Sequence, residues 1–287
     1  MVTAGLPLRL ACAQLTGRLR DAGCPDPSFD AAWLLRYVTG RDPRLDDTPL
    51  SESEAARLED LARQRAGRIP LQYLAGRWPF LDMELAVGPG VLIPRADTEV
   101  VCEAAAARVR DLPAPRVLDL CAGTGALGLG VRSLVPAAHV TLLEKSPEAF
   151  AYLQRNCTEQ AAARPGPAPV PVQGDIFTWQ DTLSAGQLDL IVSNPPYLTG
   201  EEMDALQPEV TFEPAMALAA GADGLDFYRH IAAAYREPLR PGGWLVLEIG
   251  WQQEQAVRGL LAAQGWTNIG SGQDYGGNPR VVWAEKS

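Results

Sequence analysis

The chain contains two kinds of hydrophobic pattern, and the change between them falls near residue 76. Residues 1–76 carry apolar side chains at intervals of three or four, which is the period of amphipathic helices. The pattern predicts helices from Leu6 to Leu19 and from Phe29 to Val38. Ser51 and Glu54 form a capping box that opens a third helix. We therefore expect a small helical N-terminal domain over residues 1–76, which either recognises a substrate or acts as a stabilising cap.

A different pattern links this region to the rest of the chain. From Trp78 to Val87 aromatic and apolar residues alternate, Gly88-Pro89-Gly90 predicts a turn, and Val91 to Ile93 resume the apolar run. Residues 77–95 are thus predicted to form a β-hairpin linker.

Residues 96–287 alternate short apolar runs with helical patterns. The first helix begins near Pro94–Glu99, with Asp97 or Thr98 as the expected N-cap. Alternation of this kind predicts an α/β fold with a mostly parallel, doubly wound, Rossmann-like sheet of seven strands. The expected strands are Arg116–Leu120, Val140–Leu143, Val170–Val172, Leu188–Ser193, Trp244–Ile249, Trp266–Ile269 and Arg280–Ala284, with later helices at Gly224–Tyr235 and Gln252–Ala263.

Candidate ligand-binding residues follow the first three of these strands. Cys121 to Gly125 form a glycine-containing loop that would let the backbone approach a ligand closely. Glu144 ends the second strand, where an acid can accept both hydroxyls of a ribose. Asp175 ends the third strand, where it could bind an adenine amine with Ile176 packed on the ring. These positions predict an adenosine-containing cofactor. A nicotinamide cofactor is the rival reading, but a full G-x-G-x-x-G pattern is absent.

The fourth strand, Leu188–Ser193, ends in Asn194-Pro195-Pro196-Tyr197. The prolines lack backbone N–H groups, so the chain leaves the sheet rigid and extended. The Asn194 side-chain oxygen and the Pro195 carbonyl could accept the two N–H groups of a planar amide or aromatic amine, and Tyr197 could stack on that group. These bonds would strengthen as positive charge grows on the attacking nitrogen. The tetrapeptide therefore predicts a site that holds a planar nitrogen in position to attack an electrophile.

Composition narrows the choice of partner and compartment. The 287 residues carry a net charge of −10 and contain no basic run, which argues against a nucleic-acid partner. The five cysteines are scattered and the two histidines lie far apart, so neither a disulfide framework nor a metal site is expected. The sequence shows neither a signal pattern nor a membrane-spanning apolar run. We expect a cytoplasmic monomer.

Taken together, these motifs resemble those of the release-factor glutamine methyltransferases, a family of S-adenosylmethionine-dependent enzymes. The likeness covers nearly the whole chain. In that family the acceptor is the glutamine amide of the Gly-Gly-Gln motif in class I peptide chain release factors. Besides the helical N-terminal region, the stretches that carry the resemblance are Leu92–Glu99, Ile191–Tyr197, Phe212–Pro214 and Asp274–Val281.

The resemblance also implies roles for individual residues. Glu144 would bind the ribose, and Asp175 with Ile176 the adenine. Asn194 and Pro195 would orient the acceptor amide beside the cofactor and, with Pro196, form the substrate loop, while Tyr197 and Phe80 would form walls around the glutamine. The methionine portion of S-adenosylmethionine would be held by Asp119, Cys121, Ala122, Gly123, Thr124 and Gly125.

Three alternatives remain open at this point. A glutamine methyltransferase acting on a ribosomal protein would share every motif. A DNA or RNA adenine-amine methyltransferase would use the same nitrogen chemistry, although the acidic charge argues against it. A non-catalytic binding module could retain the cofactor fold. The sequence assigns no particular role to Arg95, Glu99 or Glu213, for which helix capping and salt bridges are expected at least as much as catalysis.

Overall fold

The computed structural model describes residues 1–287, which form two compact units. The first unit contains Met1–Gly76 together with the distant segment Gln207–Phe212. The second contains Arg77–Leu206 and Glu213–Ser287. The chain therefore leaves the second unit briefly and returns to it.

The first unit is helical, as its periodicity predicts. Both halves of the capping box at Ser51 and Glu54 are present, and Gly40 ends the second helix in the left-handed conformation, at φ 70°. Buried leucines from the three longer helices, including Leu15, Leu34 and Leu58, make the core. The helices are α1 (Leu8–Asp21), α2 (Pro27–Thr39), α3 (Glu52–Ala66) and α4 (Leu71–Ala75), and the segment from the distant part of the chain contains a 3-10 turn, η2 (Val210–Phe212).

A buried ion-pair network holds the distant segment within this unit. The Arg65 guanidinium donates to Asp30 at 2.7 Å and to Glu209 at 2.8 Å. Arg68 donates to the same Glu209 carboxylate, at 2.7 Å through its Nε. Arg65 and Asp30 are both buried, so each needs the other as a partner.

The second unit opens with the expected hairpin, but the hairpin closes at a different turn from the one that we predicted. Strands β1 (Arg77–Phe80) and β2 (Met83–Ala86) pair with Phe80 opposite Met83. The turn is therefore made by Leu81 and Asp82, with Leu81 in the left-handed region at φ 50°. Gly88-Pro89-Gly90 does form a turn, in which the Val91 amide donates to the Gly88 carbonyl at 3.4 Å, but this turn lies beyond the hairpin. Val91 to Ile93 do not form a strand.

The main sheet has seven strands in the order β5-β4-β3-β6-β7-β9-β8. The first five are parallel, and the last two run antiparallel to their neighbours. This confirms the mostly parallel, doubly wound α/β prediction. The strands are β3 (Arg116–Leu120), β4 (His139–Glu144), β5 (Val170–Gln173), β6 (Leu188–Ser193), β7 (Leu239–Glu248), β8 (Thr267–Gln273) and β9 (Pro279–Glu285).

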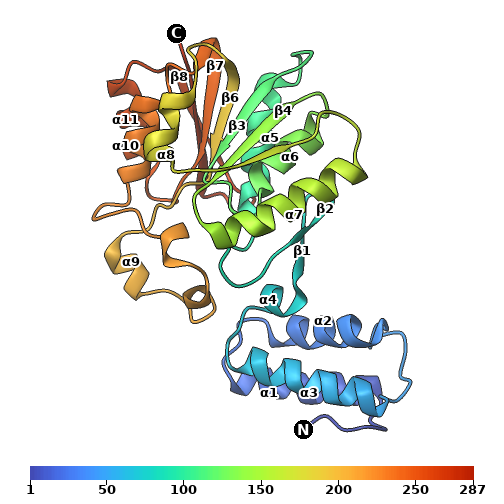
Figure 1. Cartoon of the computed structure of the whole chain (residues 1–287). Coiled ribbons are helices and arrows are strands. Elements are labelled where there is room, and N and C mark those ends of the chain that lie inside the picture. Colours follow the sequence, from blue (N-terminus) through green and yellow to red (C-terminus); the bar gives the residue numbers. More distant parts are fainter. The chain divides into compact units, whose positions relative to one another are not determined.

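Helices cover both faces of this sheet, as Figure 1 shows. Alternate residues of β6 enter two separate cores: Leu190 and Val192 face α5, α6 and α7, whereas Ile191 faces α10 and α11. This explains why the strand is a continuous apolar run. The helices are α5 (Asp97–Val109), α6 (Ala126–Leu134), α7 (Pro147–Ala163), α8 (Ile176–Trp179), α9 (Gly200–Asp204), α10 (Asp226–Ala234) and α11 (Glu254–Ala263), with 3-10 turns η1 (Gln180–Thr182) and η3 (Ala215–Ala217).

The start of α5 also differs from the prediction. Its N-cap is Ala96, without a side-chain bond, so Asp97 and Thr98 lie inside the first turn. The Thr98 hydroxyl donates to Glu248 at the end of β7 and is not used as a cap. None of the helices combines the length and apolar character that crossing a bilayer would need.

Candidate functional site

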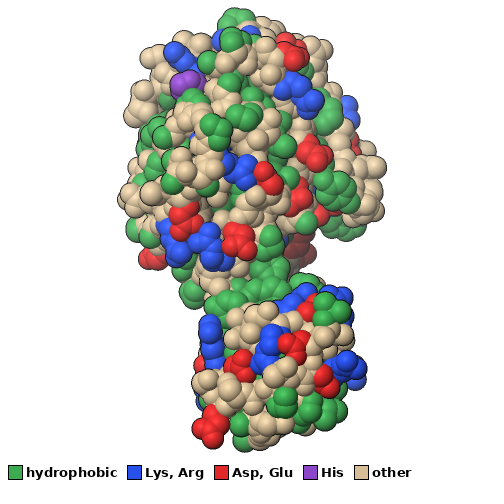
Figure 2. Space-filling view, turned by 90° about the vertical axis from the view of Figure 1, so that its right-hand side faces the viewer, with side chains coloured by type: hydrophobic (Ala, Val, Ile, Leu, Met, Phe, Trp, Pro, Cys, Tyr) green, Lys and Arg blue, Asp and Glu red, His purple; other side chains and the backbone are tan.

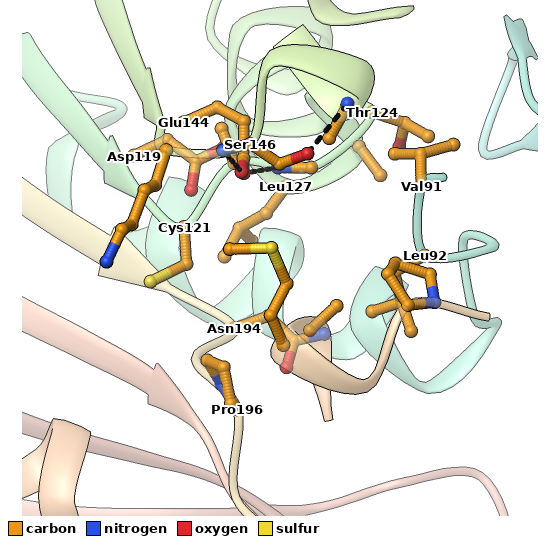
Figure 3. A pocket seen from close by; sticks show the side chains of 18 of the residues that line it. Val91, Leu92, Asp119, Cys121, Thr124, Leu127, Glu144, Ser146, Asn194 and Pro196 are labelled. Carbon is orange, nitrogen blue, oxygen red and sulfur yellow. Dashed lines mark hydrogen bonds between the residues drawn. The ribbon is translucent and has the colours of Figure 1, made fainter. Parts of the chain in front are cut away.

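A cavity of about 270 Å³ opens at the carboxyl ends of β3, β4 and β6 (Figure 3). The chain runs outward from β3 through β4 to β5 and then returns to β6 on the other side of β3. Ligands of doubly wound sheets bind at this kind of switch in strand order. Residues of the segments Gly90–Arg95 and Pro214–Ala217 also line the cavity. Every lining residue belongs to the second unit.

The loop after β3 brings its backbone to the cavity. Cys121 and Gly123 both have positive φ, at 59° and 55°, and the Ala122 amide donates to Leu143 at 3.0 Å. Gly125 has φ 86°, and a Cβ there would lie 2.8 Å from the Leu153 side chain. Of the predicted loop residues, Cys121, Ala122, Gly123 and Thr124 line the cavity, whereas Gly125 is the N-cap of α6.

Asp119 is a buried carboxyl at the end of β3 with an unused oxygen. Its Oδ2 accepts the Gly128 amide at 2.8 Å, while Oδ1 has no hydrogen-bond partner. Burial raises the pKa of Asp119 to about 8, against the lowering effect of the Gly128 bond. Because Asp119 lines the cavity, its free oxygen suits a ligand that brings a positive charge or an N–H donor.

Glu144 ends β4 with both carboxylate oxygens fixed by backbone. Oε2 accepts the Gly123 amide at 2.8 Å, and Oε1 accepts the Ser146 amide at 2.7 Å. A carboxylate has about four lone-pair sites, so each oxygen can still accept one further bond. Two adjacent hydroxyl groups would satisfy that capacity.

Asp175 and Ile176 lie at the same cavity beyond β5. Asp175 pairs with Lys145 at 2.8 Å and accepts the Phe177 amide at 3.0 Å, so it also caps α8. Partial burial acts to raise the pKa of the Asp175 carboxyl, but these two partners outweigh it and lower the pKa below its usual value. Ile176 is buried and offers an apolar surface.

The substrate loop begins where β6 ends. Asn194 and Pro196 line the cavity, and Asn194 lies across it from Glu144 (Figure 3). The Asn194 Nδ2 lies 3.4 Å from the Thr98 hydroxyl. Pro195 is buried next to them and does not line the cavity.

Tyr197 and Phe80 also lie outside the cavity lining. The Tyr197 backbone is fixed by Leu218 at 3.1 Å and by the Gln253 side chain at 2.9 Å, while its ring packs against the sheet core. Burial, and next the Glu248 charge, raise the pKa of Tyr197 to about 12. Phe80 is buried in the other core, where its ring approaches Gly130. The structure therefore brings ten of the fourteen predicted residues to the cavity surface: Asp119, Cys121, Ala122, Gly123, Thr124, Glu144, Asp175, Ile176, Asn194 and Pro196.

Sequence reasoning missed several residues of this site. Thr98 lines the cavity through its contact with Asn194, and Met216 and Phe227 supply apolar surface. Glu213, to which we assigned no particular role, accepts the Ile93 amide at 2.9 Å and pairs with Arg95, so it joins two walls of the cavity. No local pattern in the sequence marks Thr98, Met216 or Phe227. Glu248, which accepts the Thr98 hydroxyl, is an acid within the otherwise apolar run Trp244–Ile249, and that was the one signal available.

The residues present fit S-adenosylmethionine. The unpartnered oxygen of Asp119 matches the ammonium group of its methionine portion. The spare acceptor sites of Glu144 match the two ribose hydroxyls. The buried Ile176 matches the flat face of the adenine.

Comparisons with known proteins agree with this geometry. Residues 11–76 match the family described as PrmC N-terminal domain, and residues 99–221 match the Methyltransferase small domain. A solved 16S rRNA N2 G1207 methyltransferase from T. thermophilus, in complex with AdoMet and guanosine, is 22% identical with a TM-score of 0.50, over 74% of this chain and 50% of that one. At this identity the likeness shows the fold alone.

Closer relatives extend over nearly the whole chain. The release factor glutamine methyltransferase of Geobacter sulfurreducens is 40% identical over 272 residues, which cover 93% of this chain and 92% of the relative. That of Salmonella typhimurium is 38% identical over 273 residues, which cover 94% and 95%. This identity and coverage place the chain among S-adenosylmethionine-dependent enzymes, and it belongs to the release factor glutamine methyltransferase family.

Proposed function

We propose that this protein methylates the side-chain amide nitrogen of the glutamine in the Gly-Gly-Gln motif of class I peptide chain release factors. The observation that carries the proposal is the position of Asn194, whose amide lines the same cavity as Asp119 and Glu144. The residues that we assign to the cofactor and the group that could hold a planar amide thus line the same cavity at the carboxyl edge of the sheet. The family's relatives bear names that specify this kind of acceptor.

The cofactor half of the cavity would be occupied by S-adenosylmethionine. When bound, this cofactor supplies an electrophilic methyl group carried on a sulfonium. We assign the methionine portion to Asp119 and the loop residues Cys121–Gly125, the ribose to Glu144, and the adenine to Asp175 and Ile176. The backbone bonds that fix Glu144 support its role, because they orient the carboxylate before the ligand arrives.

The acceptor half would be formed by the loop after β6. In this proposal the Asn194 Oδ1 and the Pro195 carbonyl accept the two N–H groups of the glutamine amide. The amide nitrogen is a poor nucleophile because its lone pair is delocalised, so its position decides the rate. Two prolines and the anchored Tyr197 backbone keep the loop rigid, which supports a positioning role. The Tyr197 ring, although held against the core, would border the bound glutamine through its edge.

The distribution of charge supports a protein acceptor. The net charge is −10, and on the face drawn in Figure 2 Lys and Arg side chains are interspersed with Asp and Glu. Binding to nucleic-acid phosphates usually rests on a continuous basic surface. We propose that the protein acts as a monomer without direct contact to nucleic acid, and its elution in size-exclusion chromatography tests the first part.

The deciding experiment is methyl transfer from labelled S-adenosylmethionine to a purified bacterial class I release factor. A release factor carrying Gln→Ala in the Gly-Gly-Gln motif and a DNA duplex serve as parallel acceptors. Label on the wild-type factor alone is the expected result. Label on none of the three acceptors, with cofactor binding intact, would redirect the proposal to ribosomal proteins. Label on DNA would overturn the charge argument.

A further inference from the structure

Three side chains from separate elements form a short chain of hydrogen bonds behind the cavity. Asn194 Nδ2 lies 3.4 Å from Thr98 Oγ1, and Thr98 Oγ1 lies 2.6 Å from Glu248 Oε2. Asn194 follows β6, Thr98 is in the first turn of α5, and Glu248 is the last residue of β7. Thr98 and Glu248 are only 3% and 1% exposed, so water has little access to the bond between them.

The chemistry of these groups gives the chain of bonds a direction. An ionised carboxylate can only accept hydrogen bonds, and a threonine hydroxyl has a single proton. Thr98 therefore donates to Glu248, and only its lone pairs are left for Asn194. Those lone pairs match the NH2 end of the Asn194 amide, which leaves the carbonyl oxygen, Oδ1, free to serve a ligand.

We propose that Thr98 and Glu248 are positioning residues that fix which end of the Asn194 amide faces the acceptor. The two ends of an amide have nearly the same shape, so the cavity wall alone would hardly distinguish them. A reversed amide would present N–H donors to the N–H groups of a glutamine, and the acceptor would lose its bond. The inference rests on the proposed function, because it gives the Asn194 oxygen the task of accepting that N–H group.

The same chain of bonds makes the orientation depend on pH. Once protonated, Glu248 can donate to Thr98, whose own proton is then free to bond the Asn194 oxygen and reverse the amide. Burial raises the pKa of Glu248 to about 7, against the lowering effects of the Thr98 bond and Arg280. The charged or titratable groups that face Glu248 are Arg95, Asp97, Cys102, Tyr197, Tyr228 and Arg280. Turnover should therefore fall as the pH drops through about 7.

The first test compares Thr98→Val with Thr98→Ser. Valine keeps the volume and removes the hydroxyl, whereas serine restores the hydroxyl. We expect Thr98→Val to lower kcat for release-factor methylation by about 10- to 100-fold, the range typical of a group that orients another. Cofactor affinity, measured by equilibrium dialysis, should stay within about twofold, and Thr98→Ser should recover most of the rate. A wild-type kcat in a folded Thr98→Val protein would overturn the inference.

The second test uses Glu248→Gln, which cannot titrate. The wild type and Thr98→Ser should lose kcat on the acid side of pH 7, and Glu248→Gln should not. An unchanged acid limb in Glu248→Gln would contradict the pH mechanism.

A third measurement needs no acceptor and so separates this inference from the proposed function. The side-chain NH2 signal of Asn194 in the ¹⁵N–¹H NMR spectrum can be identified by its loss in Asn194→Ala. It should titrate near pH 7 in the wild type and stay constant in Glu248→Gln. If the wild type fails to methylate release factors, the proposed function fails, while this titration still decides whether the three side chains are coupled. A signal that is constant in both proteins would refute the coupling.

Discussion

Asp119 and Glu144 bring carboxyl groups to the cavity at the ends of their strands, whereas Asn194 brings an amide. Asp119 and Glu144 can only accept bonds once ionised, whereas an amide has a donor end and an acceptor end. An amide can thus be held from behind through its NH2 group while it accepts an N–H group in front. In the proposed function, this is the reason for a neutral residue directly after β6.

Removing this group should affect turnover far more than cofactor binding. We expect Asn194→Ala to lower kcat by about 10²- to 10³-fold, by analogy with the loss of one preorganised transition-state hydrogen bond. The affinity for S-adenosylmethionine, followed by calorimetry, should change little. Gln264→Ala, which removes an exposed amide after α11, is the matched control and should leave both quantities unchanged. Near-normal turnover of Asn194→Ala would show that Asn194 does not position the acceptor.

Asp119 should make the stability of the folded protein depend on pH. Its pKa is raised from 3.8 to about 8, so between these values the folded state holds a proton that the unfolded state has lost. The free energy of unfolding should therefore decrease as the pH rises from 4 to 8. In urea titrations at pH 5 and pH 8, Asp119→Asn should show a smaller decrease than the wild type.

The Asp119→Asn variant should bind S-adenosylmethionine about 10- to 100-fold more weakly, because a hydrogen bond to a charged group contributes about 1.5–3 kcal/mol. Asp111→Asn changes an exposed carboxyl outside the cavity and provides the control for both measurements. Equal affinities for all three proteins would mean that the free oxygen of Asp119 does not contact the cofactor.

At the scale of elements, the close approach of α6 to β3 requires glycine. A Cβ at Gly128 would lie 2.8 Å from the Asp119 carboxylate and 2.8 Å from Leu142. Gly128→Ala should therefore destabilise the protein by about 1–3 kcal/mol. Gly259 in α11 has open space around it, and Gly259→Ala should stabilise the protein by up to about 1 kcal/mol. Urea unfolding of the pair measures both effects, and equal shifts would contradict the packing argument.

Glu213 joins two loops that have no secondary structure of their own at the point of contact. Its buried carboxylate accepts the Ile93 amide and pairs with Arg95. Glu213→Ala should lower the free energy of unfolding by about 1–3 kcal/mol, because a buried amide loses its acceptor.

Cofactor binding should also weaken in Glu213→Ala, since both loops line the cavity. Glu201→Ala, at an exposed position in α9, is expected to change neither quantity. A Glu213→Ala protein with normal stability and normal cofactor affinity would show that the two loops hold their positions without it.

The sequence predicted β3 and β6 to the residue, because buried parallel strands are continuous apolar runs bounded by turn residues. The hairpin turn was misplaced for an equally physical reason. Leu81 adopts a left-handed conformation that its residue type gives no sign of, while Gly88-Pro89-Gly90 carries the usual turn residues without making the hairpin.

The candidate site was predictable to the extent that it depends on strand ends. Asp119, Glu144 and Asn194 each lie at or next to the carboxyl end of a parallel strand, so their approach follows from the fold class. The bonds among Asn194, Thr98 and Glu248 could not be predicted, because they join positions 96 and 150 residues apart. They depend on how α5 packs across β6 and β7, which no local pattern encodes.

At the scale of the whole molecule, the segment Gln207–Phe212 belongs to one compact unit while both of its flanks belong to the other. The first unit is therefore not a continuous stretch of chain. On the ribosome, Arg65 would emerge 144 residues before its partner Glu209. Until then Arg65 has only Asp30 as a counter-ion within its unit. The N-terminal unit is thus expected to reach full stability late in synthesis, after β6 and the Asn194 loop have left the exit tunnel. The two units would therefore complete their folding during the same late stage of synthesis.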